Sequence, residues 1–233
     1  MVKLNDSYDT KFSEMSEGMM TFVKEKLDDE QMGIMGEAAK KLKESMPDPG
    51  IKVGMKAPDF TLKDISGSTT IKLSEELKNG PVVLAFYRGA WCPVCNMHLK
   101  ALQEIAPTLK SDHNASIIAV TPQMPEVTKK QFEDNSVTYK AGFDSDDAVA
   151  KAYGLNFELD PKLNVVYKGL GLNVEACNGD GRLDLPVPAT FVIRKNGKIA
   201  AAQADTDYMN RMKPDEIVAG LISIKNNGSC VIS

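Results

Sequence analysis

Hydrophobic residues recur at three- and four-residue steps along the first 46 residues, with polar residues between them. This spacing places the apolar side chains on one face of a helix and predicts two amphipathic helices. The prolines of segment 47–50 disfavour helical backbone, so the second helix should end there and residues 1–50 should form an N-terminal helical extension. The apolar positions are Phe12, Met15, Met19, Phe22, Val23, Leu27, Met35, Ala38, Ala39, Leu42 and Met46.

From residue 51 onward, short β-rich runs alternate with segments of helical spacing. The apolar run 82–87 predicts a central buried strand. The order strand, helix, strand implies parallel pairing with a right-handed crossover and predicts an α/β domain over residues 51–225. We expect strands at 60–62, 71–73, 82–87, 116–120, 139–143, 189–194 and 199–203, and helices at 99–109, 126–135, 146–153 and from residue 214.

Two connections differ from the other loops. The dipeptide Asn196-Gly197 joins the last two strands and predicts a two-residue hairpin with positive φ angles. Residues 156–185 are rich in glycine and have no clear period, so we expect a long irregular loop there. Loops of that length in a compact domain often carry function.

Composition excludes several kinds of function. The chain has 233 residues and a formal net charge of -4, which argues against a nucleic-acid-binding surface. We find no signal peptide and no run of membrane-spanning length, so we expect a cytoplasmic protein. Four cysteines are too few for a disulfide scaffold in a chain of this size. A close pair of them in a reducing compartment indicates redox or metal chemistry.

The close pair, Cys92 and Cys95, follows the central strand at the point where a helix should begin. Free backbone N–H groups and the helix dipole favour an anion there, so a thiolate is stabilised at neutral pH. Pro93 suits the first turn of a helix because its missing N–H would have had no partner. Arg88 is close enough in the chain to add positive charge, although a surface ion pair is an equally good interpretation of it.

The spacing of the pair favours redox chemistry over zinc binding. A second thiol one helical turn away can resolve a sulfenic acid or a mixed disulfide formed on the first. A structural zinc site needs two further ligands, and the only histidines are His98 and His113. Burial of both cysteines as apolar residues is a weaker alternative at a strand-to-helix junction. We therefore expect no metal and no cofactor.

Several motifs carry a resemblance to a known family. They are the segment 53–62, the strand segment 83–87, Asp144 with the segment 148–154, the Tyr-Arg-Gly-x-Trp-Cys-Pro-x-Cys signature at 87–95, and the segment 185–191. Over residues 51–221 the chain resembles bacterioferritin-comigratory-type peroxiredoxins of the AhpC/TSA family, in the thioredoxin superfamily. The resemblance implies a thioredoxin fold, with a central mixed sheet flanked by helices. It also implies thiol-dependent reduction of hydrogen peroxide or organic hydroperoxides.

Two departures from the family pattern leave the nucleophile open. Cys92 stands where the family has a Thr or Ser hydroxyl, and Pro188 stands where it has an Arg. By the peroxiredoxin register, Cys95 is the nucleophile and Cys92 resolves. By the logic of thioredoxin, Cys92 at the exposed helix start is the nucleophile and Cys95 resolves. The expected access to the helix start favours Cys92.

Other residues are candidates for a substrate pocket beside Pro93. Trp91 resembles the tryptophan that flanks the thioredoxin groove, and Pro188 resembles the cis-proline that packs against its disulfide. Gln123 follows a strand at the carboxyl edge of the sheet, where ligand sites form, although such a residue more often stabilises a loop. Trp91 is equally well explained by packing. The more distant Arg182 and Arg211 are weaker candidates, and Cys177 is assigned no role.

The last eight residues, 226–233, are expected to form a flexible tail. They end in Cys230-Val231-Ile232-Ser233, a C-a-a-X arrangement that directs farnesylation in a eukaryotic cell. A single lipid would give weak membrane contact at most. The methionine-rich N-terminal helices provide a candidate homodimer surface, although such stripes usually pack in a core.

These observations predict a thiol-dependent peroxidase that reduces hydroperoxides through a Cys92/Cys95 dithiol cycle. The expected reductant is thioredoxin, glutaredoxin or glutathione. Two alternatives stay open: a protein disulfide reductase of thioredoxin type, and a redox-sensing interaction module without peroxidase activity.

Overall fold

The centre of the molecule is a mixed β-sheet. The structure, a computed structural model, describes residues 4–228, and in this range seven strands pair in the order β2-β1-β5-β4-β3-β8-β9. β3, β4 and β5 are parallel, and the other pairings are antiparallel. The strands are β1 (Thr61–Asp64), β2 (Thr70–Lys72), β3 (Val82–Phe86), β4 (Ser116–Thr121), β5 (Lys140–Phe143), β8 (Ala189–Ile193) and β9 (Ile199–Ala204), with a separate pair β6 (Asn156–Glu158) and β7 (Asp184–Pro186).

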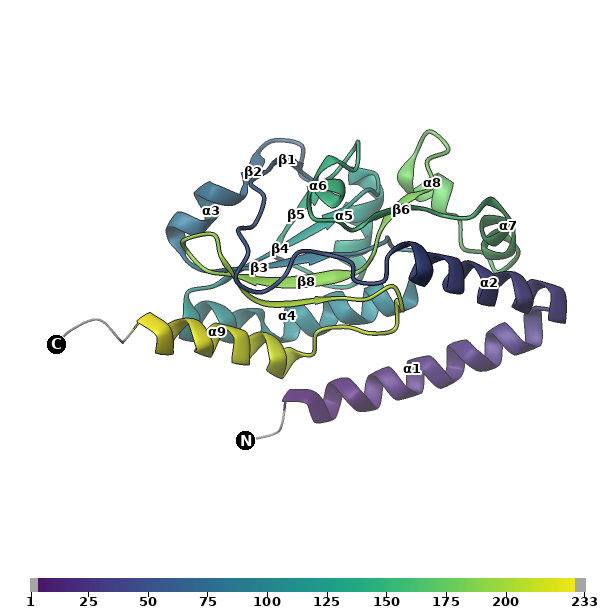
Figure 1. Ribbon diagram of the computed structural model, residues 1–233, viewed down its shortest axis with the longest axis horizontal. Helices are drawn as coiled ribbons and strands as arrows, with labels where there is room; N and C mark the ends of the chain where they lie inside the picture. Colours follow the sequence, from purple (N-terminus) through teal and green to yellow (C-terminus); the bar gives the residue numbers. More distant parts are fainter. Residues whose placement is uncertain (1–3, 229–233) are drawn as a thin grey trace.

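Helices cover both faces of this sheet (Figure 1). α4 and α9 pack on one face, where Leu102, Ile105 and Ile217 meet the side chains of β3, β4 and β8. On the other face Phe86 and Tyr153 bring their ring centroids to 5.0 Å. The helices are α1 (Leu4–Lys26), α2 (Asp29–Ser45), α3 (Leu73–Asn79), α4 (Pro93–His113), α5 (Pro125–Asp134), α6 (Ala148–Ala152), α7 (Pro161–Gly169), α8 (Val174–Asn178) and α9 (Pro214–Gly228).

The two N-terminal helices lie along the domain and contact it at several places (Figure 1). α1 packs against α4 and α9, and α2 packs against α7. Asp28 and Gln31 form a capping box that starts α2, since each side chain accepts a hydrogen bond from the other residue's backbone N–H. Ion pairs Lys11–Glu104 (2.7 Å) and Lys213–Asp9 (2.9 Å) join α1 to the domain.

The predicted architecture is confirmed: a central mixed sheet with flanking helices, preceded by N-terminal helices. The boundaries drawn at residues 50 and 225 stay a prediction, and α9 continues past the second of them to Gly228. Cys230 lies outside the described residues. No helix of the described chain combines the length and apolar character that crossing a membrane requires.

The expected irregular loop at 156–185 is wrong, because this stretch contains β6, α7, α8 and β7. Asp160 begins α7 by accepting a hydrogen bond from Lys162 N (2.8 Å), and Asn173 begins α8 by accepting one from Ala176 N (3.0 Å). Both are ordinary N-cap residues, but the helices are only nine and five residues long. Helices this short have too few turns to show a hydrophobic period.

The turn between β8 and β9 is also different from the prediction. Arg194 N donates to Lys198 O (2.9 Å), which encloses three loop residues rather than two. Only Gly197 has a positive φ, of 78°, and Asn196 does not. A three-residue hairpin that places a glycine in this conformation is the next most common solution after the two-residue turn.

Candidate active site

The sheet brings the ends of three segments together around the cysteine pair. Phe86 at the end of β3 pairs with Val120 of β4 and with Ala189 of β8. The chain leaving β3 therefore lies next to Pro188 and to the turn after β4. Cys92 is the N-cap residue of α4, Pro93 occupies the first turn, and Cys95 follows one turn later. Both cysteines are free thiols.

The loop that precedes the pair is clamped by Gln123. The Gln123 side chain is fully buried, and its Oε1 accepts a hydrogen bond from Ala90 N at 2.6 Å. Its Nε2 donates to Thr128 Oγ1 and Gln131 Oε1, both at 3.0 Å. All of its polar atoms are thus used within the fold. These contacts agree with the alternative that Gln123 stabilises the loop, and its contact with substrate stays a prediction.

Gly89 is required at this turn by conformation and by space. Its φ is +150°, a region that residues with a side chain rarely adopt. A Cβ added there would come within 2.7 Å of Trp91 Nε1 and 3.1 Å of Gln123 Oε1. The glycine therefore lets the loop close tightly against the Trp91 and Gln123 side chains.

Each sulfur has a buried guanidinium as its neighbour. Arg88 Nη2 lies 3.1 Å from Cys92 Sγ, and Arg211 Nη2 lies 3.6 Å from Cys95 Sγ. Both arginines are at most 8% exposed. Arg88 is where the sequence predicted it. Arg211 lies 116 residues after Cys95 in the chain, and only the packing of the segment before α9 brings it to the site.

Aromatic rings enclose the Arg88 guanidinium. Its central carbon lies 4.8 Å from the ring centroid of Trp91 and 4.2 Å from that of Tyr208. Trp91 in turn contacts Tyr167 at a centroid distance of 5.6 Å. Such cation–π contacts stabilise a desolvated cation and restrict its orientation. Trp91 therefore belongs to the site, while Tyr208 had no motif that could have indicated it.

The electrostatics of the site place the negative charge on Cys95. Burial alone would raise the pKa of Cys95, but a hydrogen bond from the Cys92 thiol and the charges of Arg211 and Arg88 hold this pKa well below its usual value. The backbone N–H of Arg88 lowers it further. Burial, together with the hydrogen bond that Cys92 gives to Cys95, raises the pKa of Cys92. The favoured state is a Cys95 thiolate beside a Cys92 thiol.

The predicted exposure of Cys92 is wrong, because Cys92 is 0% and Cys95 1% exposed. They belong to a cluster of buried side chains against which Phe12, Met15 and Met19 of α1 also pack. Tyr208 and Met209 from the segment before α9 pack against the same cluster. The N-terminal extension and the chain before α9 therefore contribute side chains to the buried cluster that contains both sulfurs.

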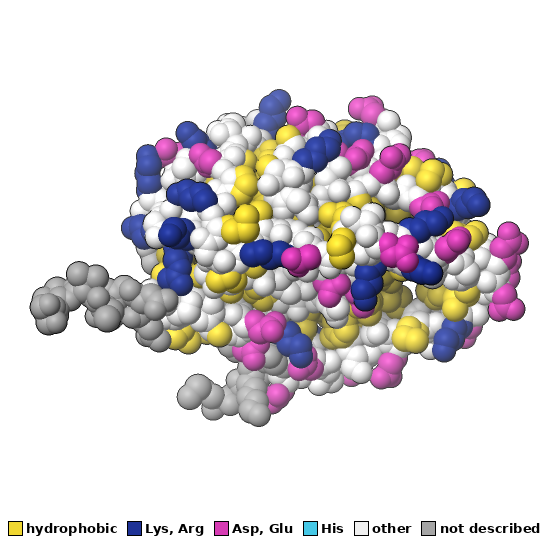
Figure 2. Space-filling view, viewed as in Figure 1, with side chains coloured by type: hydrophobic (Ala, Val, Ile, Leu, Met, Phe, Trp, Pro, Cys, Tyr) yellow, Lys and Arg dark blue, Asp and Glu magenta, His cyan; other side chains and the backbone are white. Residues whose placement is uncertain are grey.

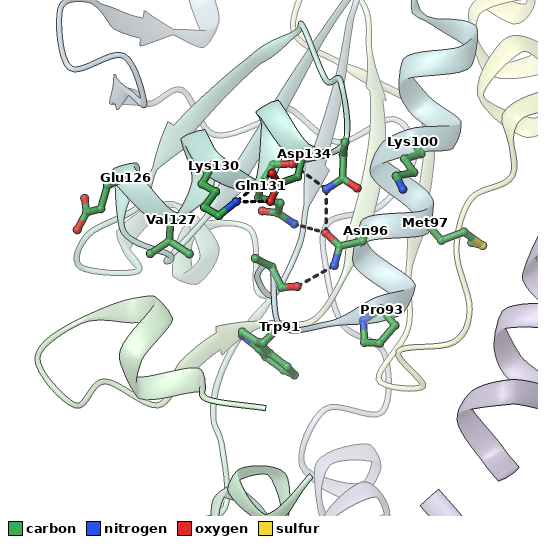
Figure 3. A pocket seen from close by; sticks show the side chains of 12 residues that line it. Trp91, Pro93, Asn96, Met97, Lys100, Glu126, Val127, Lys130, Gln131 and Asp134 are labelled. Carbon is green, nitrogen blue, oxygen red and sulfur yellow. Dashed lines mark hydrogen bonds and ion pairs between the residues drawn. The ribbon is translucent and has the colours of Figure 1, made fainter. Parts of the chain in front are cut away.

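Two hollows adjoin the cysteine-bearing loop, and they divide the predicted pocket residues. A groove of about 910 Å³ between α4 and α5 is lined by Trp91 and Pro93 (Figure 3). Asn96 in this groove donates to Ala90 O (2.7 Å) and accepts from Gln131 Nε2 (2.7 Å), which ties α4 to α5. A second cavity, of about 810 Å³, is lined by Arg88 and Pro188.

Pro188 lies at the site as predicted, at the start of β8 beside the end of β3. No peptide bond among the described residues is cis, so the expected likeness to the thioredoxin cis-proline is wrong at this point. Pro188 contributes a buried wall to the second cavity.

Arg182 and Cys177 are the remaining candidates, and the fold explains their positions. Arg182 donates to the backbone oxygens of Ser145, Pro122 and Asn178, and thereby joins the loops after β4 and β5. Cys177 is half-buried on α8, and burial raises the pKa of its thiol. Within residues 4–228, no group of three or more His, Cys, Asp or Glu side chains is arranged to hold a metal ion.

A mixed sheet that carries a Cys-x-x-Cys pair where its central strand meets a helix defines a thiol redox protein of the thioredoxin superfamily. The chain belongs to the AhpC/TSA family, whose family model matches residues 53–202. Thiol-disulfide oxidoreductase ResA of Geobacillus thermodenitrificans is 27% identical over 176 residues, covering 75% of this chain and 79% of that protein. ResA of Bacillus anthracis is 27% identical over 149 residues, covering 64% and 68%.

Solved structures with the same fold include peroxiredoxins. Peroxidoxin BcpB from Mycobacterium tuberculosis aligns over 76% of this chain and 97% of its own, with a TM-score of 0.58 and 23% identity. A mutant of peroxiredoxin 6 of Arenicola marina aligns over 77% of this chain and 76% of its own, with a TM-score of 0.60 and 19% identity. At these identities the similarity establishes the thioredoxin-type fold. Oxidoreductase chemistry at a thiol pair follows from the family and the curated relatives together.

Proposed function

We propose that this protein is a dithiol peroxidase in which Cys95 attacks the hydroperoxide and Cys92 resolves the product. The observation that carries the proposal is the placement of a buried guanidinium against each sulfur. One cation stabilises the attacking thiolate, and the other is in place for the charge that develops on the leaving oxygen. Cys92 occupies the position at which the family has a hydroxyl, and its S–H supplies a weak donor there.

The proposed reaction uses only the two cysteines and one hydroperoxide molecule, and it transfers two electrons from the thiols to the O–O bond. The Cys95 thiolate attacks the terminal oxygen of the hydroperoxide, the O–O bond breaks, and the departing alkoxide takes the Cys92 proton. Cys95 is then a sulfenic acid and Cys92 a thiolate. Cys92 attacks the Cys95 sulfur, forms the disulfide and expels hydroxide, which a proton from the buffered solvent converts to water. An external dithiol, or two glutathione molecules, returns the pair to its reduced state.

Rapid mixing of reduced protein with hydrogen peroxide tests this proposal, with each cysteine replaced in turn. Cys95→Ser should abolish rapid peroxide consumption. Cys92→Ser should retain one turnover and accumulate a sulfenic acid on Cys95, identified by dimedone trapping and mass spectrometry. Trapping on Cys92 in the Cys95→Ser variant would contradict the assignment of the nucleophile. An absence of peroxide consumption in the wild-type protein would contradict the peroxidase itself.

A second candidate function is the reduction of protein disulfides. A redox-sensing interaction module, which would use the same thiol pair without enzyme activity, is the third. The reduction of protein disulfides is favoured by the names of the curated relatives, which are thiol-disulfide oxidoreductases. Burial of both sulfurs disfavours it, since a protein disulfide needs an accessible attacking thiol. Insulin-disulfide reduction without peroxide consumption would select this function.

The partners and location proposed with this activity come from the sequence. The reductant is thioredoxin, glutaredoxin or glutathione, the protein is a cytoplasmic homodimer, and Cys230 is a farnesylation site in a eukaryotic host. Reduction assays with each thiol system, sedimentation analysis of the full chain and mass spectrometry of Cys230 test these points separately.

A further inference from the structure

The second cavity is enclosed by the N-terminal extension and the stretch that contains β6 and α7. On the face in Figure 2, hydrophobic side chains gather in a hollow between the N-terminal helices and the rest of the molecule. The cavity volume of about 810 Å³ is within the range of small-molecule sites. Its apolar wall includes Met35, Leu42, Met46, Phe157, Leu163 and Tyr167.

Arg88 is the buried cation among the residues that line this cavity. It is 5% exposed, and among the described residues the one hydrogen bond of its side chain is to Cys92 Sγ. Its Nε is buried and has no hydrogen-bond partner. Since Trp91 and Tyr208 lie over the guanidinium, a further acceptor would bind at its edge. The guanidinium carries more N–H donors than the one used at Cys92, and an oxygen atom of a molecule bound in the cavity would accept a hydrogen bond from this edge.

The charges around the cavity favour a head group with a single negative charge or none. Lys41 is exposed, and Glu158 and Asp160 are also on the lining. These two carboxylates oppose a multiply charged head such as a phosphate ester. The long apolar wall is complementary to a hydrocarbon chain, and the one buried arginine beside it is complementary to an oxygen-bearing head group.

We propose that this cavity binds a single-chain fatty amphiphile, with its oxygen head at Arg88 and its hydrocarbon chain along α2 and α7. Two sources share this chemistry: a fatty acid, bound through its carboxylate, and a fatty acyl hydroperoxide, bound through its peroxide. The second source rests on the proposed peroxidase function, and the first does not. In both cases the head lies beside Cys92.

Direct binding of palmitate tests the cavity without any turnover. Trp91 is the only tryptophan and contacts both Arg88 and Tyr167, so its fluorescence should change as palmitate binds. We expect a saturable response with one palmitate per chain by calorimetry, and no response to acetate, which has no chain. The absence of saturable palmitate binding overturns the proposal.

Two substitutions on α7 supply a matched pair. Leu163 lines the cavity, whereas Val165 is 69% exposed and does not. Leu163→Glu should weaken palmitate binding at least about tenfold, because it places a carboxylate against the hydrocarbon chain. Val165→Glu should bind as the wild type does. Circular dichroism checks that both variants are folded. Equal loss in both variants, or in neither, overturns the assignment of the cavity.

A kinetic experiment then distinguishes the two sources. If the ligand is a hydroperoxide, linoleic acid hydroperoxide should be reduced with a KM that Leu163→Glu raises and Val165→Glu leaves unchanged. Palmitate binding without turnover of linoleic acid hydroperoxide assigns the fatty acid as the ligand. Failure of the peroxidase is seen separately, as an absence of reaction with hydrogen peroxide in the rapid-mixing experiment.

Discussion

Each sulfur of the dithiol lies against an arginine that comes from a different part of the chain. Arg88 precedes the pair by a few residues, and Arg211 precedes α9. A buried anion is tolerated only with paired charge and hydrogen bonds. The two guanidiniums provide both, so the site favours one thiolate in surroundings that would otherwise keep both groups protonated.

Arg211→Met should raise the pKa of Cys95, because it removes the adjacent positive charge while keeping a side chain of similar bulk. Cys95 is an acid, so a higher pKa leaves less thiolate at pH 7, and peroxide reaction should slow there and recover as the pH rises. A pH titration of thiolate absorbance and of the reaction rate measures both. Arg211→Lys should restore part of the shift, and Arg182→Met should leave the titration unchanged. An unaltered titration in Arg211→Met would contradict the role of Arg211.

Gln123→Leu should lower the free energy of unfolding by about 3 kcal/mol, since it leaves the buried N–H of Ala90 without a partner and removes one hydrogen bond each from Thr128 and Gln131, which keep their others. Gln103→Leu is a matched control. Gln103 accepts hydrogen bonds from Thr138 at an exposed place, so its loss should cost about 1 kcal/mol or less. Urea unfolding of both variants measures the difference, and equal losses would contradict the clamp.

At this scale the sequence identified the residues that are close together in the chain. Cys92, Cys95, Arg88 and Trp91 belong to one nine-residue motif, 87–95, and the structure places them together. Arg211 was named only as a more distant candidate and Tyr208 was missed, because long-range packing alone brings them to the pair. Gln123 was located near the site, but its role depends on hydrogen bonds that only the folded loop defines.

At the scale of elements, we expect α1 to control access to the dithiol. Phe12, Met15 and Met19 pack against the buried cluster that contains both sulfurs. A helix docked mainly by partly buried side chains opens at a lower free energy than the core does. This makes α1 a suitable element to control access to thiols that are closed in the resting structure.

Phe12→Ala should increase the rate of Cys92 and Cys95 alkylation by about tenfold, because the lost apolar contact of roughly 1.4 kcal/mol favours the open state. Phe22→Ala is the control, since Phe22 is on the same helix but is 44% exposed. Reaction with iodoacetamide, followed by mass spectrometry of each thiol, measures the rates. Similar acceleration in the two variants would show that α1 does not act as the cover.

The pattern of apolar positions predicted elements with a clear period and missed short ones. Both N-terminal helices and α4 were predicted from repeated apolar steps. α7 and α8 were not, because nine and five residues provide too few turns, although Asp160 before Pro161 and the cap residue Asn173 were visible signals. In residues 156–185, the capping residues therefore indicated where helices begin, whereas the spacing of apolar residues did not.

For the whole molecule, His98 links stability to pH. It is buried in α4, and its Nε2 lies 3.2 Å from the carbonyl oxygen of Met212 before α9. Burial, with the positive charge of Arg211, lowers the pKa of His98 to about 3. The unfolded chain takes up this proton near pH 6.5 and the folded protein does not, so stability is lost as the pH falls below about 6.5.

The contribution of His98 to the free energy of unfolding of the wild-type protein should fall by about 2 kcal/mol between pH 7 and pH 5. Asp147, whose burial raises its pKa to about 6, acts in the opposite direction over part of this range. Comparison with His98→Gln isolates the histidine, because the variant keeps Asp147. Denaturant unfolding at both pH values should show a smaller pH dependence in the variant, and an identical dependence would contradict this account.

The contact between α1 and α9 has a consequence for biosynthesis. α1 leaves the ribosome long before Lys213, with which its Asp9 pairs, and α9, against which it packs. Until α9 has been made, α1 therefore has no completed surface on which to dock. The nascent chain then carries the dithiol with this packing incomplete, and cellular oxidants and chaperones meet a more open form than the folded protein presents.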